Sequence, residues 1–316
     1  MINGIHHITA LASDPQRNLD YYVGVLGLRL VKRTVNFDAP DVYHLYYGDE
    51  IGQPGTILTF FPFPDAVRGK HGVGEISAVA FQAPRGSLEF WVERLSRYGI
   101  HIDGPFRRFD DELIAFQDPD GMAIELVFSD SQSSYRHWSD SPVPAEFAIR
   151  RFHGATLQLG SRNETDDVLQ ETLKFRFTGQ NDNRFRYLIG SNESEAAIDL
   201  LINPTLPRAR QSAGSVHHIA WRVTNEASQQ QWRERLIGVG MHPTEMLDRQ
   251  YFQSVYFREP GGVLFEIATD SPGFAIDEQV EKLGTELKLP PWLEPERLKL
   301  ERILPPIDLK NTCLVG

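Results

Sequence analysis

The sequence predicts an α+β protein built from four tandem βαβββ modules, which form two open, cleft-enclosing, β-barrel-like halves and are followed by a C-terminal tail. The dipeptide His6-His7 near the start of the chain returns as His217-His218 near its end, each time inside an apolar stretch typical of a β-strand. The order strand, helix and three strands then recurs about every 65 to 75 residues. A module of this size leaves sheet edges and one face open, so we expect the modules to pack in pairs.

The first module shows the pattern most clearly. An apolar strand at 5–12 is followed by a helix that Ser13 or Asp14 can cap. Gly24 or Gly27 can end this helix, because glycine readily adopts the left-handed backbone of a helix C-terminus. The three strands that follow are LRLVKRTVNF (28–37), VYHLYYG (42–48) and GTILTFFPF (55–63).

The other three modules repeat this order. Their first strands are expected at 75–83, 152–159 and 216–223. Their helices are expected at 86–99, after a cap near Asn163, and after Asn225. The remaining strands are expected at 101–109, 113–118, 121–128, 175–180, 185–190, 196–202, 241–250, 251–259 and 262–268.

Composition divides the chain into four parts. Residues 129–149 are rich in Ser, Asp and Pro and predict a linker. We therefore expect an N-terminal domain of two modules at 1–128 and a C-terminal domain of two modules at 150–270. Residues 271–316 do not begin a fifth module, and their prolines and apolar spacing predict a tail that wraps the body.

Charge and composition exclude several classes of partner. A net charge of −11 argues against nucleic acid, whose phosphate backbone needs a basic stripe. The apolar runs are too short to span a bilayer, and no signal peptide is visible. Cys313 is the only cysteine, so no disulfide framework or thiolate metal site is expected. These features favour a cytoplasmic protein, and they leave a homo-oligomer possible.

Aligning the modules by eye brings potential metal ligands to two equivalent positions. The first-strand position holds His7, Ser77, His153 and His218, and the last-strand position holds Thr59, Glu125, Asp199 and Glu266. Equivalent side chains point the same way in each module, because strand side chains alternate with period two. Glu266 lies in an apolar strand, where a carboxylate without a cation would be costly. Imidazole and carboxylate side chains therefore indicate a metal site.

The pairing of modules decides the ligand set, and periodicity leaves this pairing open. Modules one and four give His7, His218 and Glu266, with Thr59 in the fourth place; modules three and four give His153, Asp199, His218 and Glu266; modules one and two give the poorer set His7, Thr59, Ser77 and Glu125. Two imidazoles and one carboxylate suit a non-haem Fe(II) that binds substrate and dioxygen together. Four protein ligands suit a Lewis-acid role for Zn or Ni.

Tandem βαβββ modules with histidine on the first strand and glutamate on the last resemble the vicinal-oxygen-chelate superfamily, which includes glyoxalase I, bleomycin-resistance proteins and extradiol dioxygenases. The resemblance covers nearly the whole chain. The run DRQYFQSVYFREPGGVLFE (248–266) is similar to ring-cleaving dioxygenases that open hydroquinones. Further similar stretches are IHHITA, VKRTVNFDAPDVYHLYYGDEIGQPGT, GSLEFWVERL, VHHIAW and ATDSPGF.

The resemblance implies that modules one and four share the working site, with modules two and three as a degenerate half. It implies Fe(II), or alternatively Mn(II), held by His7, His218 and Glu266. It also implies roles beside the metal or against the substrate for His6, Thr9, His217, Arg249 and Tyr256. Imidazoles near the metal can accept or return a substrate proton. Arg249 and Tyr256 can stabilise a developing oxyanion or a superoxide-like oxygen.

The leading hypothesis is a metal-dependent dioxygenase that inserts O2 into a small aromatic substrate of the hydroquinone or catechol type. A second hypothesis is a glyoxalase-like lyase or isomerase that uses Zn or Ni. A third is a non-catalytic protein that binds a small aromatic molecule and confers resistance to it. His44 and Arg33 are candidates for the wall of the cleft, with structural roles favoured.

Overall fold

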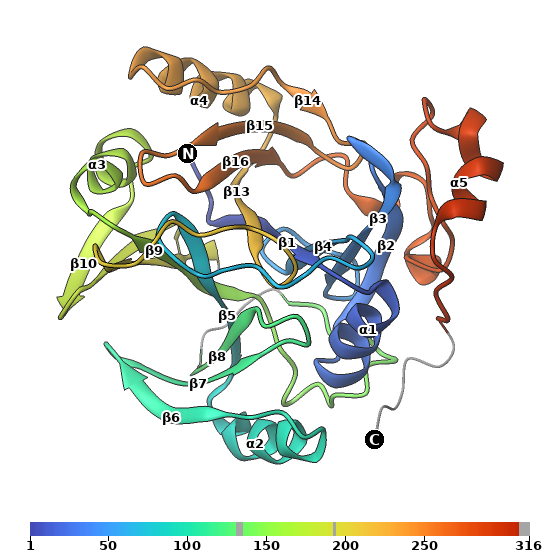
Figure 1. Cartoon of the computed structure of the whole chain (residues 1–316), viewed down its shortest axis with the longest axis horizontal. Coiled ribbons are helices and arrows are strands. Elements are labelled where there is room, and N and C mark those ends of the chain that lie inside the picture. The colour runs from blue at the N-terminus through green and yellow to red at the C-terminus, as the bar shows by residue number, and fades with distance from the viewer. Residues whose placement is uncertain (131–134, 192–193, 310–316) are drawn as a thin grey trace.

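The computed structural model describes residues 1–130, 135–191 and 194–309. In these residues the chain forms two curved mixed sheets of eight strands each. Figure 1 shows the two sheets with the helices α2, α3 and α4 at the periphery. The predicted α+β class with four βαβββ modules is confirmed.

Both sheets keep the first strands of their modules at the centre. The first sheet has the order β14 (Leu247–Asp248), β15 (Gln253–Arg258), β16 (Leu264–Thr269), β13 (Val216–Val223), β1 (Ile5–Ala12), β4 (Ile57–Pro62), β3 (Ala39–Gly48) and β2 (Arg29–Asn36). The second sheet has the order β10 (Arg176–Asn181), β11 (Arg184–Ile189), β12 (Ala196–Ile202), β9 (Phe152–Leu159), β5 (Glu75–Pro84), β8 (Ala123–Ser129), β7 (Asp111–Gln117) and β6 (Asp103–Arg108). The helices are α1 (Pro15–Leu19), α2 (Leu88–Arg97), α3 (Asn163–Asp167), α4 (Glu226–Gly238) and α5 (Arg297–Ile303), with π turns at η1 (Asp20–Val25) and η3 (Val168–Thr172) and 3-10 turns at η2 (Arg85–Ser87), η5 (Phe274–Ile276), η6 (Val280–Lys282) and η7 (Glu294–Glu296).

Each sheet combines one module from either side of the linker. Modules one and four meet where β1 pairs antiparallel with β13, and modules two and three meet where β5 pairs antiparallel with β9. The pairing of modules one and four that the resemblance implied is therefore present. The expected domains 1–128 and 150–270 are each continuous in sequence, but each of them contributes one module to each sheet. Connections 63–74 and 203–215 lead from one sheet to the other side by side, and the Lys70 backbone N–H donates to the Arg210 carbonyl at 2.9 Å.

Local sequence signals mark the starts of α1 and α4 and the end of the turn that follows α1. The Asp14 carboxylate accepts a hydrogen bond from the Arg17 backbone N–H at 2.7 Å, so Asp14 is the cap of α1. Asn225 caps α4 in the same way. Gly27 has a φ of +73°, and a Cβ there would lie 2.6 Å from Val143. Asn163, expected near a cap, is instead the first residue of α3.

The strand expected at 241–250 is reduced to the two residues of β14. Pro243 has no N–H to donate to a neighbouring strand. The Thr244 N–H still donates to the Tyr256 carbonyl at 2.9 Å, so this segment follows β15 without forming a regular ladder. Its looser course leaves the segment free to line the cavity described below.

One bulge recurs in all four first strands. In each, the cross-strand register skips one residue: His6 in β1, Ser77 in β5, His153 in β9 and His217 in β13. A bulge places two residues opposite one and turns the extra side chain away from strict alternation. The first histidine of each doublet is therefore not forced onto the face opposite the second.

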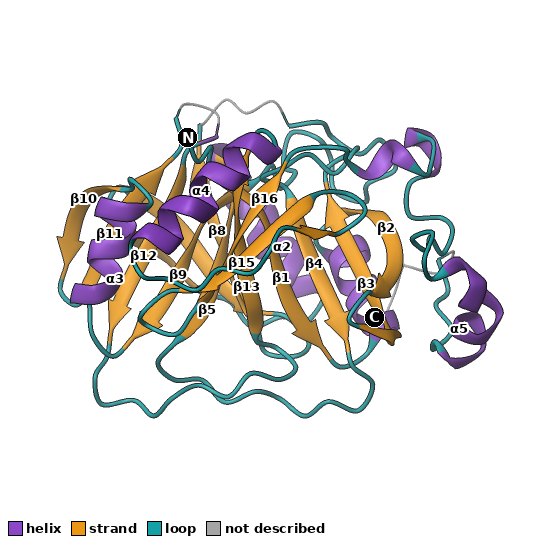
Figure 2. Cartoon of the chain, turned by 90° about the horizontal axis from the view of Figure 1, so that it is seen from above, coloured by secondary structure: helices purple, strands orange, loops and turns teal. Residues whose placement is uncertain are grey.

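A buried ion cluster holds the C-terminal segment against β2. Lys32 is fully buried, and its Nζ lies 2.5 Å from Asp277 Oδ1 and also contacts Glu278. The Tyr251 hydroxyl donates to the other Asp277 oxygen at 3.0 Å. Phe274 packs between the rings of Tyr46 and Tyr251. The segment thereby braces the wall formed by β2 and β3, and Figure 2 shows α5 beyond these strands.

Two further features complete the description. No helix in the described part of the chain is long and apolar enough to cross a lipid bilayer. Cys313 lies outside the described residues.

We predict that Lys32→Met lowers the free energy of unfolding by about 3–5 kcal/mol, because it leaves two carboxylates in a buried place without a cation. Urea denaturation followed by circular dichroism measures this loss. Lys299→Met, which breaks an exposed pair with Glu296, is the matched control and should leave stability unchanged. Equal stabilities for wild type and Lys32→Met would show that the cluster does not hold the segment.

Candidate metal centre

Three strands of the first sheet bring His7, His218 and Glu266 together. His7 Nε2 lies 3.2 Å from His218 Nε2 and 3.3 Å from Glu266 Oε2, and His218 Nε2 lies 2.9 Å from the same carboxylate oxygen. All three side chains are buried. Among the residues that the structure describes, they form the one group of three or more potential ligands that could hold a metal ion.

The chemistry of this group fits a divalent cation. Glu266 Oε1 accepts a hydrogen bond from the Ser254 hydroxyl at 2.5 Å, while Oε2 faces the two ring nitrogens and has no other donor within the described chain. Burial raises the pKa of Glu266, but His7 and His218 outweigh burial and hold it well below its usual range. A buried carboxylate and two converging imidazole nitrogens need positive charge between them. Imidazole and carboxylate are suitable donors for Fe, Mn, Ni or Zn.

The bulged histidines orient the two imidazoles of this triad. His6 Nδ1 lies 2.9 Å from His7 Nδ1, and His217 Nδ1 lies 2.7 Å from His218 Nδ1. His6 also hydrogen-bonds the backbone of Thr269. Burial, with its neighbouring histidine, lowers the pKa of His6, and burial followed by His218 lowers that of His217 to about 3. Both are therefore neutral acceptors for the Nδ1 protons of His7 and His218, which leaves each Nε2 lone pair free for a metal.

A cavity of about 400 Å³ opens beside the two histidines of the triad. Six of the eight predicted site residues line it: His7, Thr9, His217, His218, Arg249 and Tyr256. His6 and Glu266 are buried behind the wall. Most of the remaining wall is apolar: Leu11, Phe37, Phe61, Phe63, Leu247, Phe252 and Leu264. The cavity can therefore hold a small aromatic molecule against the triad.

Arg249 and Tyr256 place a cation and a phenol at this cavity. The Arg249 guanidinium lies 5.5 Å from the centre of the Tyr256 ring and 3.0 Å from Asp38. Burial opposes its charge, but Tyr256 and Asp38 raise the pKa of Arg249, so it stays cationic. Burial, followed by the charge of Glu266, raises the pKa of Tyr256, which therefore keeps its proton. Both groups are donors to a ligand oxygen.

Sequence reasoning underestimated one part of the wall. His44 and Tyr46 both line the cavity, and His44 bonds Thr59, the residue in the place of a fourth ligand. Alternation in β3 puts His44 and Tyr46 on one face, which was the available signal. Arg33, also a candidate for the wall, does not line this cavity and donates to the Thr285 carbonyl at 3.3 Å.

The second sheet corrects the alignment of the modules. The bulges make His153 equivalent to His6 and His217, so placing His153 with the two ligand histidines is wrong by one residue. Ala78 and Gly154 occupy the ligand positions instead. A Cβ on Gly154 would lie 1.9 Å from the Ala197 carbonyl oxygen, so no histidine fits there without a backbone shift.

Arginines supply the positive charge in the second sheet. Arg108 binds Glu125 through two hydrogen bonds of 2.7 and 2.8 Å. Arg186 binds Asp199 through two further bonds, and Arg184 contacts the same carboxylate at 3.2 Å. The cavity between them holds only about 10 Å³. Among the described residues this half holds no group of three converging potential ligands, and arginines lie where a cation would be, as expected of the degenerate half that the resemblance implied.

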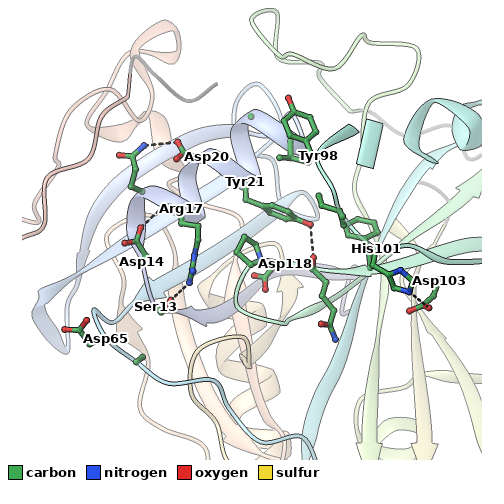
Figure 3. Close-up of a pocket in the computed structure, with 18 residues that line it drawn as sticks. Ser13, Asp14, Arg17, Asp20, Tyr21, Asp65, Tyr98, His101, Asp103 and Asp118 are labelled. Carbon is green, nitrogen blue, oxygen red and sulfur yellow. Dashed lines mark hydrogen bonds and ion pairs between the residues drawn. The ribbon is translucent and has the colours of Figure 1, made fainter. Parts of the chain in front are cut away.

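A larger cavity, of about 1200 Å³, lies elsewhere. It is an open groove between α1–η1 and residues 98–103 and 116–119, shown in Figure 3. Among its acidic side chains, Asp20 accepts a hydrogen bond from Gln16, and Asp103 lies 3.4 Å from His101. None of the described residues that line the groove belongs to a group of three converging potential ligands, so the groove has volume without a metal-like site.

Comparison with known proteins agrees with this geometry. The family model described as Glyoxalase/Bleomycin resistance protein/Dioxygenase superfamily matches residues 4–126 and 163–267. "Putative ring-cleaving dioxygenase MhqO" of Bacillus subtilis (strain 168) is 41% identical over 308 residues, which cover 98% of this chain and 97% of that protein. "Chlorohydroquinone/hydroquinone 1,2-dioxygenase" of Sphingobium indicum is 37% identical, covering 96% of each.

Two solved structures show the likeness of the fold. The structure of a "putative dioxygenase from Bacillus subtilis subsp. subtilis str. 168" superposes with a TM-score of 0.94 at 41% identity, covering 98% of both chains. Glyoxalase I from Zea mays superposes with a TM-score of 0.62 at 14% identity, covering 85% of this chain and 92% of that one. The second likeness concerns the fold alone.

We predict that Glu266→Gln lowers the affinity for ferrous ion by at least about 100-fold, because the amide removes the charge that faces two ring nitrogens. Elemental analysis after anaerobic loading and dialysis measures the bound metal. Glu125→Gln changes the equivalent residue of the second sheet and is the matched control. Wild-type metal content in Glu266→Gln, or metal lost equally in both variants, would contradict the assignment.

Proposed function

The chain belongs to the glyoxalase/bleomycin resistance protein/dioxygenase superfamily, and we propose that within it this protein is a metal-dependent dioxygenase that opens the ring of hydroquinone-type aromatics. The observation that carries the proposal is the buried triad of two histidines and one glutamate at the wall of a small, largely aromatic cavity. Similarity along nearly the whole chain to proteins named as ring-cleaving and hydroquinone dioxygenases supports the reaction class.

Fe(II), or alternatively Mn(II), is the proposed ion, with His7, His218 and Glu266 as its ligands. Three protein ligands on a six-coordinate ion leave positions for a substrate oxygen and for O2. The ion would supply the redox chemistry that dioxygen requires. Thr59 stands where a fourth ligand, a second carboxylate, would be, and its hydroxyl instead bonds His44 and Thr9. The donor set therefore favours this ion over the four-ligand Zn or Ni site of a glyoxalase-like lyase.

The chain's own residues would hold and polarise the aromatic ring. Phe61 and Phe252 give the ring an apolar wall and exclude water. His217 Nδ1 accepts a hydrogen bond from the Nδ1–H of His218, so the other N–H of the His217 ring is available to a ligand oxygen. The Arg249 cation and the Tyr256 hydroxyl stabilise negative charge that develops on oxygen during ring opening.

Three further expectations accompany this proposal. The partners are a small aromatic diol and O2, in keeping with the apolar wall and the donors of the cavity. A cytoplasmic location and a homo-oligomeric state stay predictions.

We predict that protein loaded anaerobically with Fe(II) consumes oxygen when hydroquinone is added, and that His218→Ala reduces this rate by at least about 1000-fold, because the site loses a ligand. An oxygen electrode measures the rate. His101→Ala, which changes an exposed histidine, is the control and should match wild type. Oxygen uptake at the wild-type rate in His218→Ala would refute the proposed site.

Metal exchange separates the reaction classes. Loading with Zn should abolish oxygen uptake, since Zn²⁺ has no redox chemistry with which to activate O2. Turnover of a thiohemiacetal by the Zn or Ni form, together with no oxygen uptake by the Fe or Mn form, would favour the lyase instead.

A further inference from the structure

A chain of hydrogen bonds crosses the cavity wall from Tyr46 to Thr9. The Tyr46 hydroxyl lies 2.7 Å from His44 Nδ1. His44 Nε2 lies 2.8 Å from the Thr59 hydroxyl, which lies 2.8 Å from the Thr9 hydroxyl. Thr9 is the cross-strand neighbour of His218 and lines the cavity. The chain thus ends beside the metal ligands.

The first member fixes the direction of every bond. Tyr46 is 1% exposed, and His44 is the partner of its hydroxyl within the described chain. A buried phenol with one partner donates its proton to it, because otherwise its O–H stays without an acceptor. The neutral imidazole then carries its proton on Nε2 and donates to Thr59. Thr59 donates to Thr9, whose own O–H is left for the cavity.

The electrostatic surroundings of His44 and Tyr46 support this direction of the hydrogen bonds. Burial, followed by the charges of His7 and His218, lowers the pKa of His44 well below its usual value, and Arg249 adds to this effect while Glu266 opposes it. Burial also raises the pKa of Tyr46. His44 is therefore a neutral imidazole and Tyr46 a protonated phenol near neutral pH, so the chain orients hydrogen bonds without carrying charge.

We propose that Tyr46, His44 and Thr59 are positioning residues that hold the Thr9 hydroxyl as a fixed hydrogen-bond donor, so that the cavity selects the ionised oxygen of a phenol or hydroquinone over the neutral hydroxyl. Arg249, Tyr256 and His217 also offer donors to the cavity, and an oxygen that carries no proton has one more lone pair with which to accept from them than a hydroxyl has. The inference rests on the proposed function and deepens it, because it names the charge state in which the substrate is held.

A chromophoric phenol tests the proposal without turnover. The ionised form of para-nitrophenol absorbs at longer wavelength than the neutral form, so difference spectra report which form is bound. Titrations are carried out anaerobically near neutral pH, with the Fe(II)-loaded protein and again after chelation. We expect wild-type protein to bind the ionised form in both states.

Two substitutions of His44 separate orientation from proton transfer. His44→Phe removes both hydrogen bonds, and we expect affinity for the ionised probe to fall about 10-fold. His44→Gln keeps a carbonyl acceptor for Tyr46 and an amide donor for Thr59, and we expect affinity close to wild type. Thr59→Val breaks the chain with little change in shape and should behave like His44→Phe. An amide cannot pass a proton along the chain, so a Gln variant as weak as the Phe variant would overturn the proposal.

A matched pair of tyrosines on β3 controls for loss of a hydroxyl. Tyr46→Phe removes the donor that fixes the direction of these hydrogen bonds, and it should weaken binding of the ionised probe several-fold. Tyr43→Phe removes a hydroxyl that donates to the Pro305 carbonyl on the other face of the strand, and should leave binding unchanged. Affinity for para-nitrotoluene, which has no hydroxyl, should be equal in all variants and shows that each has kept its cavity.

The outcomes separate this inference from the proposed function. Equal affinity of wild type, His44→Phe and Thr59→Val for the ionised probe would overturn the inference, whatever the oxygen uptake. If no hydroquinone supports oxygen uptake but these binding differences appear, the proposed function fails and the donor chain stands.

Discussion

The antiparallel pairing of β1 with β13 is the constraint on which the site depends. It brings together residues that lie 211 positions apart in the sequence, and a bulge in each strand keeps both histidines of a doublet in contact. Without the bulges, alternation would send His6 and His217 to the far face. With them, each ligand imidazole has an Nδ1 partner within 3 Å and is held in the tautomer that a metal requires.

The two sheets compensate the charge of their buried carboxylates in different ways. Both carry carboxylates on a central, buried strand, and such groups need compensating charge. In the second sheet three arginines bind Glu125, Asp199 and Asp111, and their guanidinium groups fill the space. In the first sheet Glu266 meets two imidazoles and the Ser254 hydroxyl, none of which carries a fixed positive charge, so the site favours a bound cation as the compensating charge. Ala78 and Gly154 stand in the second sheet where the first sheet has His7 and His218, so the second sheet lacks both imidazoles.

The sequence predicted the elements and the position of the histidine doublets because their signals are local or repeated. The choice of His7, His218 and Glu266 as one ligand set came from the resemblance, since periodicity left the pairing of modules open. Alternation located the strands, Asp14 and Asn225 marked helix starts, and the repeated His doublet marked the site. The error at His153 has a physical cause: a bulge shifts the alternation by one residue without changing the apolar pattern. Lys32 could not be foreseen as a buried cation, because a lysine in an alternating strand reads as exposed, and its partners lie some 245 residues away.

The two histidine doublets are equivalent in the sheet, but they are not equivalent at the cavity. His6 is 2% exposed behind the wall, whereas His217 reaches the cavity. Module four therefore supplies His217, Arg249 and Tyr256 to the cavity, and module one supplies Thr9 with its supporting hydrogen bonds. Donors from both modules in an apolar cavity limit how a bound ring can turn, because a turn that moves its oxygen away from a donor loses a hydrogen bond. The two modules thus present different donors to one cavity, although their strands and their histidine doublets repeat.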